Sequence, residues 1–116
     1  MATPGFVHEA PDALTPETRD LHRALTSLME ELEAIDWYQQ RVEATTDPQL
    51  RAILAHNRDE EKEHAAMVLE WIRRRDPAFD GYLREYLFSS GSITGREEAA
   101  DAKPAAAAPV TVGSLR

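Results

Sequence analysis

Cysteine is absent from the 116 residues of this chain. Its absence excludes disulfides, Fe–S clusters and cysteine-based zinc sites. Any bound metal must therefore be held by oxygen atoms and by the imidazole nitrogens of the four histidines. The missing thiols thus restrict the candidate chemistry to carboxylate and histidine sites.

Long apolar runs are also lacking. No stretch approaches the roughly 18 apolar residues of a membrane-spanning helix. The segment that begins at Met1 lacks the basic and apolar regions of a secretory signal, so we expect a cytoplasmic protein. Aromatic residues make up only 7% of the chain, which favours helices over strands. The net charge of −8 disfavours nucleic acid and anionic lipid as partners and attracts cations.

Composition divides the chain into four segments. Residues 1–14 contain two prolines, Pro4 and Pro11, and are expected to form an irregular arm. Residues 15–90 are rich in helix-forming residues and make up the predicted domain. Residues 91–109 are rich in alanine and proline and predict a flexible linker. Residues 110–116 form a separate terminal peptide.

Three helix starts are marked by a capping residue followed by proline, at Thr15, Asp47 and Asp76. The pattern predicts helices over about 16–45 and 48–75, and a short amphipathic helix from 77 that stops near residues 89–91. The first two helices are joined by a short connection, so they must be antiparallel neighbours. The predicted fold is all-α: an antiparallel two-helix hairpin plus a short C-terminal helix.

Polar residues interrupt the apolar stripe of each long helix. A spacing of four and three residues places a set of side chains on one buried seam. In the first helix the stripe contains Ala24, Leu28, Glu31, Ile35, Tyr38 and Val42; in the second it contains Leu50, Leu54, Asn57, Glu61, His64, Val68 and Trp71.

The acidic and imidazole groups of these stripes indicate a metal site. Glu61 and His64 lie three residues apart, about 4.5 Å along a helix, so both can reach one ion. A buried carboxylate without a partner costs several kcal/mol, and a divalent metal compensates it. A second interpretation stays open, because residues 57–64 are a charge-rich run of the kind that often forms a solvated face.

One chain supplies only half of a known ligand set. Di-iron carboxylate bundles use one Glu from each of two helices and Glu-x-x-His from each of two others. This chain offers Glu31 on one helix and Glu61 with His64 on the other. A two-fold dimer would complete both the ligand set and a ferritin-like four-helix bundle. Carboxylates with imidazole suit iron.

The same residues resemble a known family. Residues 30–41, 56–65, 69–74 and 86–88 are similar to motifs of the encapsulated ferritins, and the resemblance covers roughly residues 8–90. It implies a ferroxidase that oxidises Fe(II) with O₂ at an inter-subunit di-iron site. It further implies a decameric ring of five dimers inside a bacterial encapsulin nanocompartment that stores and detoxifies iron.

The resemblance also implies roles for individual residues. Glu61 would bridge the two irons, with Glu31 and His64 as terminal ligands. Tyr38 would lie beside the centre and hydrogen-bond to the ligands. Glu30, Glu33 and Trp37 match an outer metal-attracting site, for which Ca²⁺ is a candidate ion; the alternative for these carboxylates is plain solvation.

The terminal peptide, residues 110–116, resembles the encapsulin cargo-loading peptide. Val110, Val112 and Leu115 supply apolar side chains for a groove on the shell protein. The preceding segment would serve as a spacer. The peptide departs from the family pattern because it begins with Val and stops at Arg116.

Two other functions compete with the ferroxidase interpretation. A non-catalytic metal-binding cargo or assembly protein of the shell would oligomerise with metal but consume no O₂. A haemerythrin-like or oxygenase-type protein would need more histidines or a larger single-chain bundle with a substrate pocket.

Overall fold

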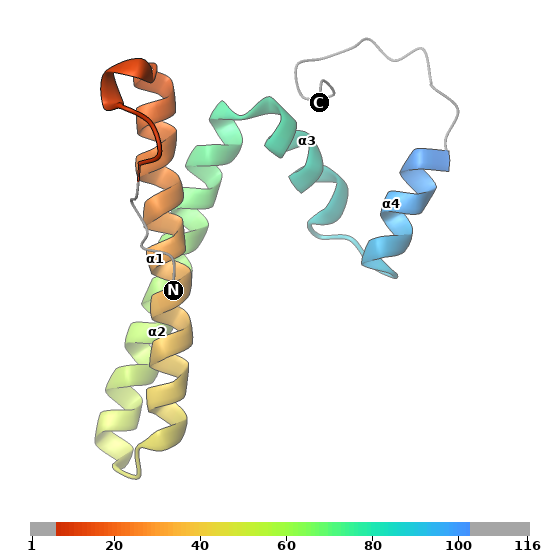
Figure 1. The fold of residues 1–116 in the computed structure, drawn as a ribbon. Coiled ribbons are helices and arrows are strands. Elements are labelled where there is room, and N and C mark those ends of the chain that lie inside the picture. Colours follow the sequence, from red (N-terminus) through yellow and green to blue (C-terminus); the bar gives the residue numbers. More distant parts are fainter. Residues whose placement is uncertain (1–6, 103–116) are drawn as a thin grey trace. The chain divides into compact units, whose positions relative to one another are not determined.

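The computed structural model describes residues 7–102, and this part of the chain is helical, without strands (Figure 1). The elements are a 3₁₀ turn η1 (Pro11–Ala13), α1 (Pro16–Ala44), α2 (Pro48–Arg75), α3 (Pro77–Tyr86) and α4 (Ile93–Ala102). The predicted all-α class is confirmed. Among the described residues no helix is long and apolar enough to cross a membrane.

Side-chain caps fix the starts of α1, α2 and α3 at the positions expected from the sequence. The Thr15 hydroxyl accepts a hydrogen bond from the Thr18 amide at 3.1 Å. Asp47 Oδ1 accepts from the Gln49 amide at 2.9 Å, and Asp76 Oδ1 accepts from the Phe79 amide at 3.0 Å. Each cap satisfies a donor that the first helical turn would leave free, so the three predicted starts are confirmed.

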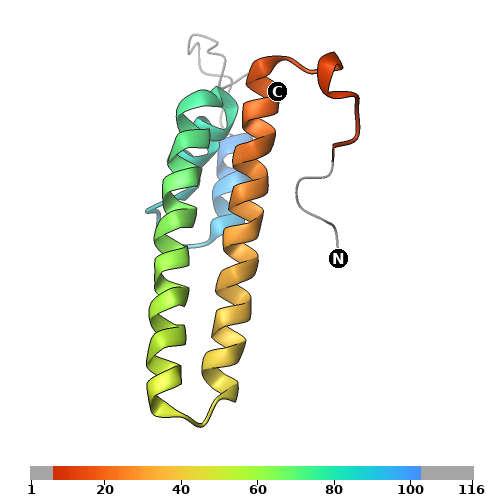
Figure 2. The ribbon, with the colours of Figure 1, turned by 90° about the vertical axis from the view of Figure 1, so that its left-hand side faces the viewer.

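The two long helices form an antiparallel hairpin, side by side in both views (Figures 1 and 2). Two arginines of α2 bind back to α1 or its end. Arg51 donates to the carbonyls of Val42 at 3.2 Å and Thr45 at 2.5 Å. Arg58 donates to Gln39 Oε1 at 2.7 Å. These contacts fix the register in which α1 and α2 face each other.

The hairpin has a thin core. Among the described residues only Ala65 and Ile72 are buried hydrophobic residues. Leu32, Ile53 and Met67 are each more than half exposed, at 54%, 53% and 58%. A surface helix normally buries its apolar stripe, and burial of one such side chain contributes about 1.5–3 kcal/mol. A large part of that stabilisation is therefore not realised by one chain alone.

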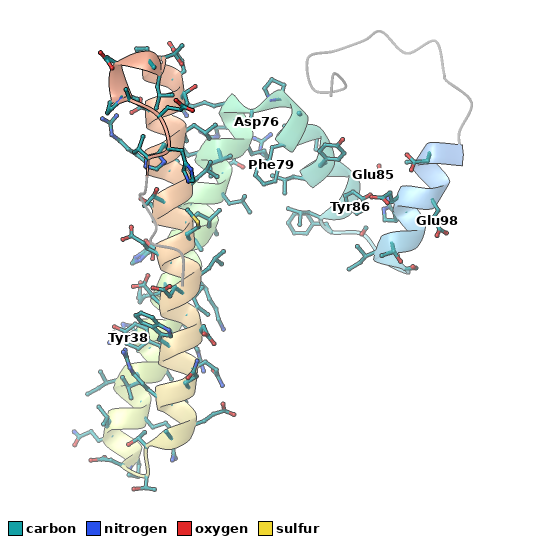
Figure 3. All side chains as sticks on the ribbon, in the orientation of Figure 1. Tyr38, Asp76, Phe79, Glu85, Tyr86 and Glu98 are labelled. Carbon is teal, nitrogen blue, oxygen red and sulfur yellow. The ribbon has the colours of Figure 1, made fainter. Side chains whose placement is uncertain are left out.

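From Arg73 onward the chain forms a second compact unit that contains α3 and α4. Asp80 on α3 is bound by Arg73 and by Arg84, whose Nε lies 3.0 and 3.1 Å from the two carboxylate oxygens. Arg96 of α4 donates to the Glu85 carbonyl at 2.9 Å, and Glu85 is labelled in Figure 3. Polar contacts thus fasten α3 to the end of α2 and α4 to the end of α3.

The C-terminal part differs from the expectation in two respects. The third helix ends at Tyr86, a few residues early, because Phe88 and Gly91 adopt positive φ angles of 58° and 81°. Residues 93–102 form α4, where a flexible linker was expected over 91–109. The Ser92 hydroxyl caps this helix by accepting from the Gly95 amide at 2.9 Å. Residues 1–6, the rest of the expected linker and the peptide 110–116 lie outside the described residues.

Candidate metal centre

The hairpin brings together the three residues that the sequence placed in its seams. Glu31 comes from α1, and Glu61 and His64 come from successive turns of α2. The Nδ1 atom of His64 lies 3.8 Å from Glu31 Oε2 and 3.8 Å from Glu61 Oε2. One ligand atom from each residue lies within 4.8 Å of the others. Such a cluster can surround one small cation.

Electrostatics inside this cluster favour a bound cation. A hydrogen bond with Glu61 raises the pKa of Glu31, and burial together with the Glu61 charge raises it further. His64 lowers the pKa of Glu31 but does not reverse the direction of the shift. Two carboxylates held so close together repel each other when both are charged. A divalent cation can neutralise both groups.

The three ligand side chains are open on one side. The exposed fractions of the Glu31, Glu61 and His64 side chains are 23%, 24% and 42%. The donor set of two carboxylates and one imidazole matches the preferences of iron and other first-row metals. Three protein ligands leave coordination positions vacant on the open side, where further ligands can bind.

A shallow groove continues this open side along the hairpin. Ser27 lies one turn before Glu31 on α1, and Val68 lies one turn after His64 on α2. Both line the groove, and so does Trp71. Its other lining residues are Asp20, Arg23, Ala24 and Met67. The ligands therefore belong to a mixed apolar face that is accessible from outside the chain.

Tyr38, labelled in Figure 3, lies on α1 two turns after Glu31 and is half-buried. Its ring contacts Arg41, whose guanidinium carbon lies 5.3 Å from the ring centre. Within residues 7–102 its hydroxyl does not hydrogen-bond to the three metal-binding side chains. The expected hydrogen bond from Tyr38 to the ligands stays a prediction for an assembled site.

The expected outer site is open to solvent. Glu30 is exposed, Glu33 is half-buried, and Trp37 is 44% exposed. Trp37 lines a shallow hollow on α1 together with Gln40, Arg41 and Ala44. One chain offers only two carboxylates here, so the outer site also stays a prediction.

Arg58 is a positioning residue that the sequence did not reveal. It was grouped with the charged run of residues 57–64, yet only 20% of its side chain is exposed. Its bond to Gln39 holds α2 against α1 one turn away from Glu61. The sequence feature that could have indicated this role is the position of Arg58 three residues before Glu61, on the side of α2 that faces α1.

Comparison with known proteins gives a consistent result. The model of the EncFtn-like family matches residues 6–90. An encapsulated ferritin-like protein of Rhodospirillum rubrum is 63% identical over 92 residues. That match covers 79% of this chain and 66% of the relative, so part of the relative lies outside the comparison.

Two further relatives and one solved structure extend the comparison. A ferritin-like protein of Thermotoga maritima is 57% identical, over 78% of this chain and 80% of that protein. An encapsulin nanocompartment cargo protein of Myxococcus xanthus is 38% identical, over 74% of this chain and 76% of that protein. A crystal structure of a protein from Nitrosomonas europaea has 64% identity and a TM-score of 0.74, covering 75% of this chain and 96% of that one.

Proposed function

This chain belongs to the EncFtn-like family, and on that premise we propose that it is a ferroxidase that oxidises Fe(II) with O₂ at a site shared by two copies. The overall reaction is 4 Fe(II) + O₂ + 4 H⁺ → 4 Fe(III) + 2 H₂O. Iron is the substrate of this reaction, and the product is material for storage.

The observation that carries the proposal is the convergence of Glu31, Glu61 and His64 in the hairpin. The raised pKa of Glu31 indicates that negative charge is in excess at the point where three ligand atoms converge. Such an excess costs folding free energy unless a cation is bound. A helical protein that needed these positions only for packing would gain more from leucine.

The need for two copies follows from ligand number and from exposed apolar surface. A di-iron bundle site requires four Glu and two His, and one chain supplies half of each. The groove beside the ligands is lined partly by Met67 and Trp71, and Met67 is 58% exposed. A two-fold partner seated on this side would cover the groove and double the ligands in one step.

We assign the ligand roles as follows. Glu61 of each chain would bridge the two metal ions, and Glu31 and His64 would be terminal ligands. Bound iron supplies the electrons for O₂ reduction. Any proton that Glu31 holds because of its raised pKa would leave when Fe(II) binds. Tyr38 orients the ligand carboxylates by hydrogen bonding within the two-chain site.

We further propose that the protein is cargo of an encapsulin shell in bacteria. This rests on relatives named as encapsulated ferritin-like and as encapsulin nanocompartment cargo. Residues 110–116 would bind the shell protein. Five dimers would form a decameric ring, with Glu30, Glu33 and Trp37 of each chain attracting Fe(II) or binding Ca²⁺ at the outer site.

The test compares two substitutions on the same helix. Glu61→Gln removes a ligand, whereas Glu63→Gln makes the same change at an exposed position. Fe(II) is added without O₂, O₂ is then admitted, and absorbance, O₂ uptake and native mass are recorded. We expect the wild type and Glu63→Gln to oxidise iron and Glu61→Gln to fail. Oligomerisation on metal without O₂ uptake would instead support the non-catalytic cargo protein.

A further inference from the structure

Asn57 is a polar residue in the metal-binding seam that the proposed ligand set does not use. It lies four residues before Glu61 on α2, about 6 Å along the helix and within about 40° of the same face. The sequence places it where the stripe of α2 otherwise carries Leu50, Leu54 and Val68. A polar amide in a helical seam weakens packing, so its presence requires a reason.

Asn57 has no hydrogen-bond partner within residues 7–102, although it is half-buried. Three of its polar neighbours on α2 have a hydrogen-bond or ion-pair partner. Arg58 binds Gln39 and Asp59, Lys62 lies 3.5 Å from Asp59, and His56 lies 3.5 Å from Glu60. The hairpin therefore satisfies the surrounding polar side chains and leaves the amide of Asn57 to solvent.

Tyr38 lies at the same level on the facing helix. The bond between Arg58 and Gln39 joins the residues that directly follow Asn57 and Tyr38 in the sequence. Tyr38 is two turns from Glu31, so it lies within about 20° of the ligand-bearing face of α1. Its hydroxyl is also without a partner within the described part of the chain. One turn or two from the candidate ligands, the seam thus carries two polar groups that hydrogen-bond to no atom of the described residues and are left to solvent.

We propose that Asn57 is a positioning residue that sets the register between two copies of the chain. A copy seated on this face removes water from the amide, which then needs a hydrogen bond to the other copy. Only one alignment of the two hairpins supplies that bond. A single buried asparagine fixes register and oligomeric state in coiled coils in the same way, at a cost in stability.

The consequence concerns the metal site. Register decides whether the Glu31, Glu61 and His64 of two copies meet at one centre, since a slip by one helical turn moves them about 5 Å apart. Asn57 thus acts through alignment and touches no metal. The inference rests on the proposed two-chain site, but it does not require that the site oxidise iron.

The test replaces Asn57 with leucine, which is similar in size and cannot hydrogen-bond. The matched control is Gln49→Leu, which makes the same kind of change at an exposed position near the start of α2. Association is measured without metal by sedimentation velocity. Binding of Co²⁺ is measured by its visible spectrum, with the number of ions per chain taken from native mass.

For Asn57→Leu we expect metal-free association to tighten by about tenfold, as expected when a buried amide is removed from a helical seam. We also expect Co²⁺ binding to weaken and more than one oligomeric state to appear. Gln49→Leu should match the wild type in both measurements. Unchanged association and unchanged Co²⁺ binding in Asn57→Leu would overturn the inference. Failure of the wild type to bind Co²⁺ would instead reject the proposed function itself.

Discussion

Two carboxylate clusters in this molecule differ in the direction of their pKa shifts. In the hairpin, Glu31 lies beside Glu61, and hydrogen bonding with that second acid raises the pKa of Glu31. In the C-terminal unit, Asp80 is bound by Arg73 and Arg84, and these two guanidinium groups lower the pKa of Asp80. Both carboxylates have side chains about a quarter exposed, at 23% and 28%. Burial acts to raise the pKa of both carboxyl groups, so the hydrogen-bonding partners decide the direction of each shift.

The comparison separates a structural cluster from a binding cluster. Asp80 carries one negative charge between two permanent positive charges, so the fold itself satisfies it. Glu31 and Glu61 carry up to two negative charges, and within residues 7–102 the basic group that lies against both is the imidazole of His64. A cluster that the chain leaves short of positive charge is where an external cation gains most.

The largest effect should come from removing the imidazole of the binding cluster. His64→Gln should weaken Zn²⁺ or Co²⁺ binding by more than about 100-fold, beyond the 10–100-fold typical for losing an outer-shell partner. The matched control is His56→Gln on the same helix, where the imidazole lies 3.5 Å from Glu60 and is exposed. Isothermal titration calorimetry measures both. If both variants lost the same metal affinity, the seam would not be a specific metal site.

The second effect is the pH dependence of metal binding. Because the pKa of Glu31 is raised, protons compete with metal at a higher pH than for an ordinary glutamate. Affinity should therefore fall as pH decreases, by up to about tenfold per pH unit for each proton displaced. Titrations with Co²⁺ between pH 7.5 and 5 at constant ionic strength measure this dependence.

The same titration sharpens the contrast with Asp80. The pKa of Asp80 is lowered, so its contribution to stability is present above the usual range of aspartate and is lost only as pH falls through the lowered pKa. The C-terminal unit should keep its ion pairs while the metal site loses affinity. A metal affinity independent of pH over this range would contradict competition between protons and metal at Glu31.

Local signals in the sequence predicted the hairpin and the proximity of Glu31, Glu61 and His64 within it. Thr15, Asp47 and Asp76 each cap a helix that starts with proline, and capping is decided by a few adjacent residues. The seam spacing placed Glu31, Glu61 and His64 together because the short connection permits only an antiparallel hairpin. These features need no information from outside the chain.

Other features were missed, one because local composition was misleading and the others because their causes are not local. The cap at Ser92 precedes Gly95, which lowers helix propensity, so α4 was read as part of a linker. The register contact of Arg58 with Gln39 joins residues 19 positions apart. Asn57 lies on the face of the hairpin that a second copy of the chain would cover. The sequence of one chain does not show what lies against that face. The sequence pattern alone could not show which polar residues of the seam find hydrogen-bond partners within a single chain.

The smallest effect is on the stability of the metal-free protein, where the two clusters should respond with opposite signs. Glu31→Gln removes one of two repelling carboxylates and should raise the free energy of unfolding in EDTA at pH 7 by about 0.5 kcal/mol, as for a partly exposed charge pair. Asp80→Asn removes the partner of two arginines and should lower it.

The sign follows from proton linkage. A carboxyl group with a raised pKa binds more protons in the folded than in the unfolded state, so it destabilises the fold as pH rises from the ordinary value of 4.5 through the raised pKa. Glu31→Gln should abolish this decline, and urea unfolding of both variants across that range will show it. If Glu31→Gln lowered stability in EDTA as Asp80→Asn does, the acids of the hairpin would be satisfied within one chain, and the need for a cation would disappear.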